Sequence, residues 1–297
     1  MNIKPQAQVA LFFALTQVLG IFTGVVLIQA AAANEELREL SVAPMAPNDP
    51  MNAVVFLVYI LFGAAMVMIA AKLFKGRTFF RLLELVVITS SSSVVFFAAA
   101  LAIGGLDVLS ALGVGMVFGI ALGGVKFFWD DLKNTAAIIS SAGVAALFGY
   151  SLGFLPTALF VILLSIYDYI AVFKTRHMIE MARELSTRQL SFAVTAKQVP
   201  DRKPHEKREE YVDRAMREGE RLDLGTGDLS VPAMMSVSAY TLGPNGLIYA
   251  LAIAAGSTLS IYLLLQFVAK QRVFLPALQP ICLGGMLSFL LVKLAGF

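Results

Sequence analysis

The 297-residue sequence has almost none of the side chains that form disulfides or bind transition metals. Its one cysteine, Cys282, lies in an apolar segment, which excludes an internal disulfide and a cysteine-rich metal site. Both histidines, His177 and His205, lie in one long polar segment, so no apolar segment contains a histidine. The sequence therefore predicts neither a metal site nor a cofactor.

Charge is scarce as well, because only 14% of the residues are charged while 58% are hydrophobic. Soluble domains are about one quarter charged, so this composition is typical of a multi-pass integral membrane protein. The run at 9–33 ends in Ala31-Ala32-Ala33, which resembles a signal-peptide cleavage site. It is too long for a signal peptide, whose apolar core has about 7–15 residues. We predict an all-α protein with nine transmembrane helices, at about 9–33, 52–73, 82–103, 106–125, 135–153, 156–173, 223–241, 246–268 and 274–295.

The basic residues predict the orientation. With the amino terminus in the cytoplasm, all of the 23 Lys and Arg residues except Arg38 and Lys293 fall on the cytoplasmic side. The carboxyl terminus is then outside, and we expect the cell membrane. The chain divides into a six-helix part (1–173), a charged cytoplasmic loop expected to be partly disordered (174–221), and a three-helix part (222–297).

Several residues within these runs have structural interpretations. Gly115, Gly119 and Gly123 recur every four residues, which predicts that another helix approaches this face closely. Glu84 lies near Arg81 at the cytoplasmic end of its run, where we expect it to reach the interface or to pair.

Two aspartates, Asp168 and Asp228, lie well inside apolar runs, where an ionisable group is costly and indicates a functional site. If the segments are helical, each carboxyl lies about 9 Å below the cytoplasmic surface, measured from Lys174 and Leu222. Two neighbouring carboxyls in such a site share one proton. One can then activate water while the other polarises a peptide carbonyl, which is the chemistry of an aspartyl protease.

Small residues and prolines accompany the acids. Gly225 and Gly227 leave space beside Asp228 for another backbone. At a similar depth, Pro276 is predicted in the first turn of the last helix, and Pro280 follows one turn later. An exposed strand edge near Pro276 or Leu224 would capture an unfolded substrate segment by backbone hydrogen bonds.

Three motifs in this order resemble those of the presenilin and signal peptide peptidase family: Tyr167-Asp168, Gly225-Thr226-Gly227-Asp228 and Pro276-Ala277-Leu278. The resemblance implies nine helices, Asp168 and Asp228 as the catalytic pair, and substrate contacts at the proline motif. We expect the site to be shaped by Tyr167, Leu224, Gly225, Thr226, Gly227, Pro276, Ala277 and Leu278.

The resemblance also implies an intramembrane aspartyl endopeptidase that acts on transmembrane proteins in the lipid bilayer and not on nucleic acid. The predicted orientation is that of presenilins, and the short chain is most similar to archaeal presenilin homologues. Thr226 departs from the leucine most often found at that position, which affects the expected cleavage preference. The sequence leaves open whether the protein forms a homo-oligomer or needs accessory subunits.

A membrane transporter or cation leak channel that uses the same aspartates is the alternative function. Against it, the sequence shows no internal repeat, and the acids are expected near one surface rather than at the midplane. Other intramembrane proteases are disfavoured, because the chain lacks His-Glu-x-x-His and a membrane histidine.

Overall fold

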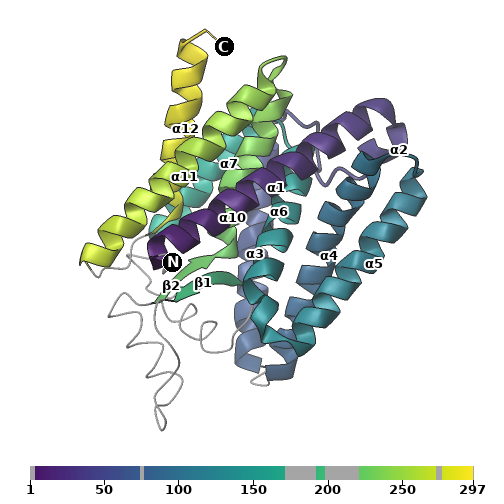
Figure 1. The fold of residues 1–297 in the computed structure, drawn as a ribbon. Helices are drawn as coiled ribbons and strands as arrows, with labels where there is room; N and C mark the ends of the chain where they lie inside the picture. The colour runs from purple at the N-terminus through teal and green to yellow at the C-terminus, as the bar shows by residue number, and fades with distance from the viewer. Residues whose placement is uncertain (1–3, 74–76, 171–191, 198–220, 272–275, 297) are drawn as a thin grey trace.

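A computed structural model describes residues 4–73, 77–170, 192–197, 221–271 and 276–296, and these residues are mainly helical (Figure 1). The helices are α1 (Pro5–Ala33), α2 (Glu35–Arg38), α3 (Met51–Leu73), α4 (Arg77–Ile103), α5 (Val108–Phe128), η1 (Asp130–Leu132), α6 (Lys133–Ser151), α7 (Phe154–Ile170), α10 (Thr226–Ala239), η3 (Tyr240–Leu242), α11 (Gly246–Gln271) and α12 (Leu278–Leu294). The strands are β1 (Ala193–Lys197) and β2 (Arg221–Gly225). Most of the loop predicted at 174–221 lies outside the described residues.

Helix α10 is the centre of the fold. It packs against α1, α6, α7, α11 and α12 (Figure 1), and every residue from Leu229 to Ala239 is buried. Glycines in the neighbouring helices make this close packing possible, because a Cβ added at Gly24 or Gly149 would overlap the side chain of Val237. The helix that carries Asp228 is therefore held from several sides.

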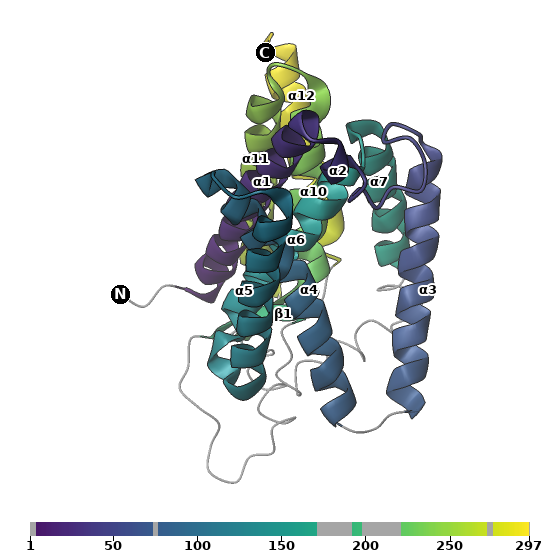
Figure 2. The same cartoon turned by 90° about the vertical axis from the view of Figure 1, so that its right-hand side faces the viewer.

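Helices α4 and α5 form a tightly packed pair at the edge of the bundle (Figure 2). A Cβ added at Gly115 would come within 2.7 Å of the Ser93 carbonyl oxygen, and one added at Gly119 within 2.7 Å of the Thr89 carbonyl oxygen. Gly123 likewise faces Thr89. The predicted close approach of another helix at these glycines is confirmed, and that helix is α4.

Glu84 of α4 is buried and forms an ion pair with Lys126 of α5, with 2.7 Å between Lys126 Nζ and Glu84 Oε1. Arg81 places its guanidinium over the ring of Phe127. Of the two expectations for Glu84, pairing is confirmed and reaching the interface is wrong: close α4–α5 packing encloses the carboxylate, and a cation 42 positions along the chain neutralises it.

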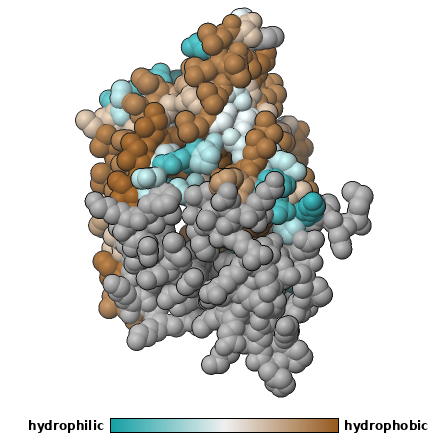
Figure 3. All heavy atoms as spheres, turned by 90° about the vertical axis from the view of Figure 1, so that its left-hand side faces the viewer, coloured by the Kyte–Doolittle hydropathy of each residue, from teal (hydrophilic) through white to brown (hydrophobic). Residues whose placement is uncertain are grey.

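Large apolar side chains cover much of the outside. Helix α3 lies at the periphery beside α7 (Figure 2) and exposes Val58, Tyr59 and Phe62. Figure 3 shows hydrophobic residues over most of the described part of another face. A soluble monomer rarely exposes apolar patches of this extent, so this surface fits contact with lipid.

By length and composition, four of the described helices can cross a membrane: Pro5–Ala33, Thr78–Ile103, Val108–Phe128 and Gly246–Val268. Shorter apolar helices are found at Met51–Val67, Phe154–Ile170 and Leu278–Leu294. Helix α10 has 14 residues and is about 21 Å long, less than the hydrocarbon thickness of about 30 Å. These apolar helices support the predicted spans at their own positions, and the count of nine spans stays a prediction.

The predicted helix at 223–241 is wrong at its beginning. Residues 221–225 form β2, which pairs antiparallel with β1, and α10 begins at Thr226. Val194 and Ala196 of β1 and Leu224 of β2 are buried in one apolar cluster with Leu229 of α10. The strand forms because pairing with β1 and burial against side chains such as Val9 of α1 and Ile261 of α11 outweigh the local tendency to continue the helix.

Candidate active site

Asp228 lies in the first turn of α10. Gly225 is the N-cap residue, and its backbone amide hydrogen-bonds the Asp228 carboxyl. An acidic side chain at the third helical position commonly reaches back to the N-cap amide in this way, and the helix dipole favours negative charge there. The end of β2 and the start of α10 therefore hold the carboxyl in place together.

The two glycines beside Asp228 differ in their surroundings. A Cβ added at Gly225 would lie 3.4 Å from Asp228 Oδ2, whereas one added at Gly227 would meet no atom within 4 Å. Gly227 is exposed, while Gly225 and Asp228 are partly buried. Gly225 thus keeps space next to the carboxyl, and Gly227 adds no side chain to the exposed start of α10.

Asp168 lies near the end of the described part of α7, which packs against α10. Its side chain is partly buried, and its carboxyl interacts electrostatically with that of Asp228. The buried Cys282 of α12 lies within electrostatic range of both carboxyls. The structure therefore brings together two acids that lie 60 positions apart in the sequence.

Residues Pro276 and Ala277 precede α12, which begins at Leu278. The prediction that Pro276 lies in the first helical turn is wrong: Ala277 is the N-cap, and Pro280 occupies that turn, where its missing amide costs little. Pro276 and Leu278 are buried, and Ala277 is partly buried. The motif is a bend that leads into the helix rather than its first turn.

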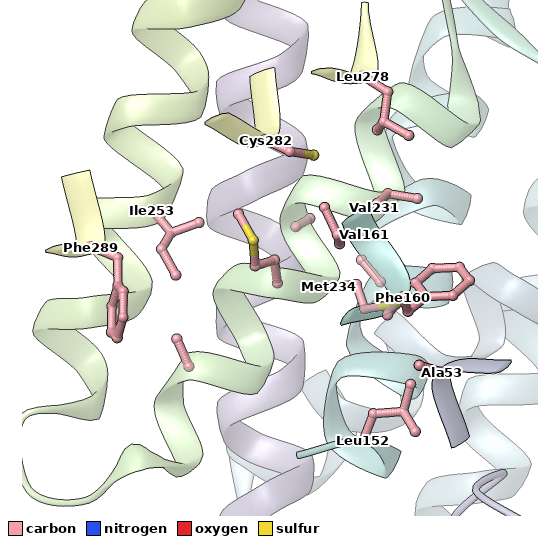
Figure 4. Packing of buried hydrophobic residues seen from close by; sticks show 14 of the residues in the cluster. Ala53, Leu152, Phe160, Val161, Val231, Met234, Ile253, Leu278, Cys282 and Phe289 are labelled. Carbon is pink, nitrogen blue, oxygen red and sulfur yellow. The ribbon is translucent and has the colours of Figure 1, made fainter. Parts of the chain in front are cut away.

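Apolar packing holds the three elements together. Figure 4 shows Leu278 and Cys282 of α12 with Val231 of α10 and Val161 of α7, all in one buried cluster. The side-chain amide of Gln279 in α12 also donates to the Ser165 carbonyl of α7 at 3.1 Å. Gln279 follows the proline motif directly, and Ser165 lies one helical turn before Asp168.

The remaining predicted site residues lie near the same place. Leu224 is buried, and Tyr167 is partly buried beside Asp168 on α7. The backbone amide and hydroxyl of Thr226 both donate to the Phe192 carbonyl, at 3.0 and 3.3 Å. Thr226 thus joins the start of α10 to the residue before β1.

Sequence reasoning did not find Gln279, Cys282 or the strand β1. Gln279 and Cys282 could have been included from the sequence, because each lies within one or two helical turns of the proline motif. Strand β1 could not, because its partner strand is distant in the sequence. Among the described residues, no group of three or more His, Cys, Asp or Glu side chains is placed to hold a metal ion.

Comparison with known proteins agrees with this geometry. The model of the family described as signal-peptide peptidase, presenilin aspartyl protease matches residues 10–296. The chain belongs to this family. It is therefore an intramembrane aspartyl protease embedded in a membrane, as its motifs indicated, and members of the family act on transmembrane substrates.

Two solved structures support the family fold. Each is described as a presenilin family intramembrane aspartate protease and is 21% identical to this chain. The TM-scores are 0.67, with 98% of this chain and 100% of the other covered, and 0.64, with 100% of both covered. A comparison with curated proteins gave no match.

Proposed function

We propose that this family member hydrolyses peptide bonds within or near transmembrane segments, with Asp168 and Asp228 as its catalytic residues. The observation that carries the proposal is the placement of two acids on packed helices, α7 and α10, within electrostatic range of each other. Structural ion pairs join opposite charges, whereas two neighbouring acids repel each other unless they share a proton. A fold has no structural reason to keep such a pair.

The proposed chemistry uses one shared proton. The ionised carboxyl takes a proton from water as the water oxygen attacks the peptide carbonyl carbon, and the protonated carboxyl donates a hydrogen bond to the carbonyl oxygen. Proton transfer to the amide nitrogen then releases the amine, and the carbon–nitrogen bond breaks. The open side of Gly227 gives an extended substrate backbone access to both acids.

Substrate capture by a strand edge follows from the pairing of β1 and β2. Thr195 is opposite Asp223, and the amide and carbonyl of Thr195 bond away from β2, to Asn134. In an antiparallel pair, when the backbone amide and carbonyl of one residue point away from the partner strand, those of the residue directly opposite also point away from it. The amide and carbonyl of Asp223 therefore face the outer edge of β2, two residues before Gly225. A substrate strand on this edge would lead its next residues toward Asp228.

For the whole chain we propose the nine-span arrangement, with the amino terminus in the cytoplasm, the carboxyl terminus outside and the cell membrane as the location. The support is the distribution of basic residues together with the apolar helices at the expected positions. Both aspartates then lie toward the cytoplasmic side.

The deciding experiment uses the purified full-length protein and a synthetic peptide with about 20 apolar residues flanked by lysines. Wild type should cleave the peptide, and Asp168→Ala or Asp228→Ala should each reduce kcat/KM by at least about 1,000-fold. Cleavage by either variant at the wild-type rate would refute the assignment. Ion flux in proteoliposomes that persists while no peptide is cleaved would favour the transporter or leak channel.

A further inference from the structure

Strand β1 is attached to the beginning of α6 through one residue, Thr195. The side-chain amide of Asn134 donates from Nδ2 to the Thr195 carbonyl at 2.8 Å, and Asn134 Oδ1 accepts from the Thr195 amide at 2.9 Å. A carboxamide presents the same donor and acceptor as a peptide group. Asn134 therefore takes the place that a third strand would occupy beside β1.

The Thr195 side chain makes a second attachment. Its hydroxyl accepts from Lys133 Nζ at 2.8 Å and donates to Asp223 Oδ1 at 2.5 Å. This one hydroxyl joins the first residue of α6 to both strands of the sheet, with a cation on one side and a carboxylate on the other. Charge-assisted hydrogen bonds are stronger than neutral ones, so this contact holds the sheet against α6 more firmly than a neutral hydrogen bond would.

These contacts leave the two edges of the sheet unequal. At Thr195 the outer edge of β1 is already bonded, so an incoming strand cannot pair there. The Asp223 backbone faces the outer edge of β2, which continues into Gly225 and the first turn of α10. Pairing with β1 is therefore blocked at Thr195, and the proposed capture is on β2, the strand that leads to Asp228.

Helix α6 also sets the position of Asp228. It packs along α10, where Gly149 approaches Val237 so closely that an added Cβ would lie 2.6 Å from the Val237 Cβ. The sheet is thus fixed to the beginning of α6, and the catalytic helix to its later turns. Helix α6 therefore holds both the sheet and α10, in addition to the direct chain connection from β2 to α10.

We propose that Asn134 is a positioning residue that selects which peptide bond is cut. It closes the β1 edge and fixes β2 relative to Asp228, so that a captured strand places one bond at the carboxyls. The inference rests on the proposed function, because it assumes cleavage by this pair and capture on β2.

The test is Asn134→Ala in the full-length protein, assayed with the same synthetic peptide and with products identified by mass spectrometry. Loss of both backbone contacts should lower kcat by about tenfold and spread cleavage over neighbouring bonds. A merely structural residue would reduce the amount of folded enzyme without changing the bond that is cut. The product pattern is therefore the decisive readout.

Three further variants separate the possibilities. Thr195→Val keeps both backbone contacts and the branched shape but loses the hydroxyl, so it should lower kcat by about threefold and leave the product pattern unchanged. Asn134→Asp keeps the acceptor, loses the donor and keeps the shape, so it should spread cleavage even if Asn134→Ala fails to fold. Gln29→Ala removes the bond from Gln29 Nε2 to the Tyr240 hydroxyl, at the other end of α1 from the sheet, and should change neither readout.

The outcomes are distinct. Broadened cleavage by Asn134→Ala or Asn134→Asp, with Gln29→Ala like wild type, supports the inference. Folded Asn134 variants that cut the wild-type bond at the wild-type rate overturn it, while the aspartate assignment stands if Asp228→Ala is inactive in the same assay. Cleavage that survives Asp168→Ala and Asp228→Ala overturns the proposed function and this inference with it.

Discussion

At the scale of single residues, Thr226 explains how the start of α10 is fixed. Its amide and hydroxyl both donate to the Phe192 carbonyl, so the residue that departs from the usual leucine connects α10 to the beginning of β1. A leucine retains the amide bond and loses only the hydroxyl bond. The unusual residue therefore strengthens an attachment that the backbone already makes.

The two glycines beside Asp228 should respond differently to replacement by alanine. Gly225→Ala puts a methyl group 3.4 Å from Asp228 Oδ2 and should lower kcat by about tenfold, because it crowds the carboxyl and its water. Gly227→Ala meets no protein atom within 4 Å, so it should keep kcat and raise KM where substrate backbone passes. Steady-state kinetics on both variants measure the difference, and equal effects on kcat would contradict it.

At the scale of elements, the fit of α6 against α10 should dominate stability. Gly149→Ala places a Cβ 2.6 Å from the Val237 Cβ and 2.8 Å from the Met234 carbonyl oxygen, and should lower the free energy of unfolding by about 1–3 kcal/mol. Gly113→Ala in α5 meets nothing within 4 Å and should be neutral or stabilising, because alanine favours helix. Thermal unfolding in detergent measures the stability of both variants. A Gly149→Ala protein as stable as wild type would refute the tight packing of α6 against α10.

Strand capture makes a prediction about the substrate. Proline has no backbone amide, so a proline just past the cleaved bond removes one hydrogen bond to the β2 edge and resists the pairing. Cleavage of such a peptide should fall by about tenfold or more, while an alanine at the same position should be tolerated. Equal cleavage of both peptides would argue against capture on β2.

The apolar runs predicted most of the helices because hydrophobicity is a local property of the chain. A strand edge was predicted near Pro276 or Leu224, and β2 includes Leu224. That β2 replaces the predicted start of the helix was missed, because its partner β1 and its apolar support on α1 and α11 come from other parts of the sequence. The pairing of Glu84 with Lys126 was missed for the same reason. The two aspartates could be chosen from sequence because an acid inside an apolar run is conspicuous by itself.

At the scale of the whole molecule, the two carboxyls belong to distant parts of the chain, and the proposed mechanism makes them share one proton. The rate of cleavage should pass through a maximum with pH. At low pH both acids are protonated and no base remains, whereas at high pH both are ionised and no proton polarises the carbonyl. Measuring kcat/KM across about pH 4 to 9 tests this, and a steady rise with alkalinity would contradict a shared proton.

The proposed orientation can be checked with single introduced cysteines. Arg38→Cys should react with a membrane-impermeant maleimide in intact cells, whereas Trp129→Cys, at a side chain that is 60% exposed, should react only after permeabilisation. The native Cys282 is buried and should not react with the maleimide. The opposite labelling pattern would invert the topology.

The buried ion pair of Glu84 and Lys126 has a consequence for biogenesis. Either charge buried without its partner between the two helices would be costly, but the two neutralise each other across 2.7 Å. Helices α4 and α5 should then leave the insertion machinery as a preassembled hairpin rather than one after the other. The contact between α4 and α5 thus predicts that these two helices enter the membrane together.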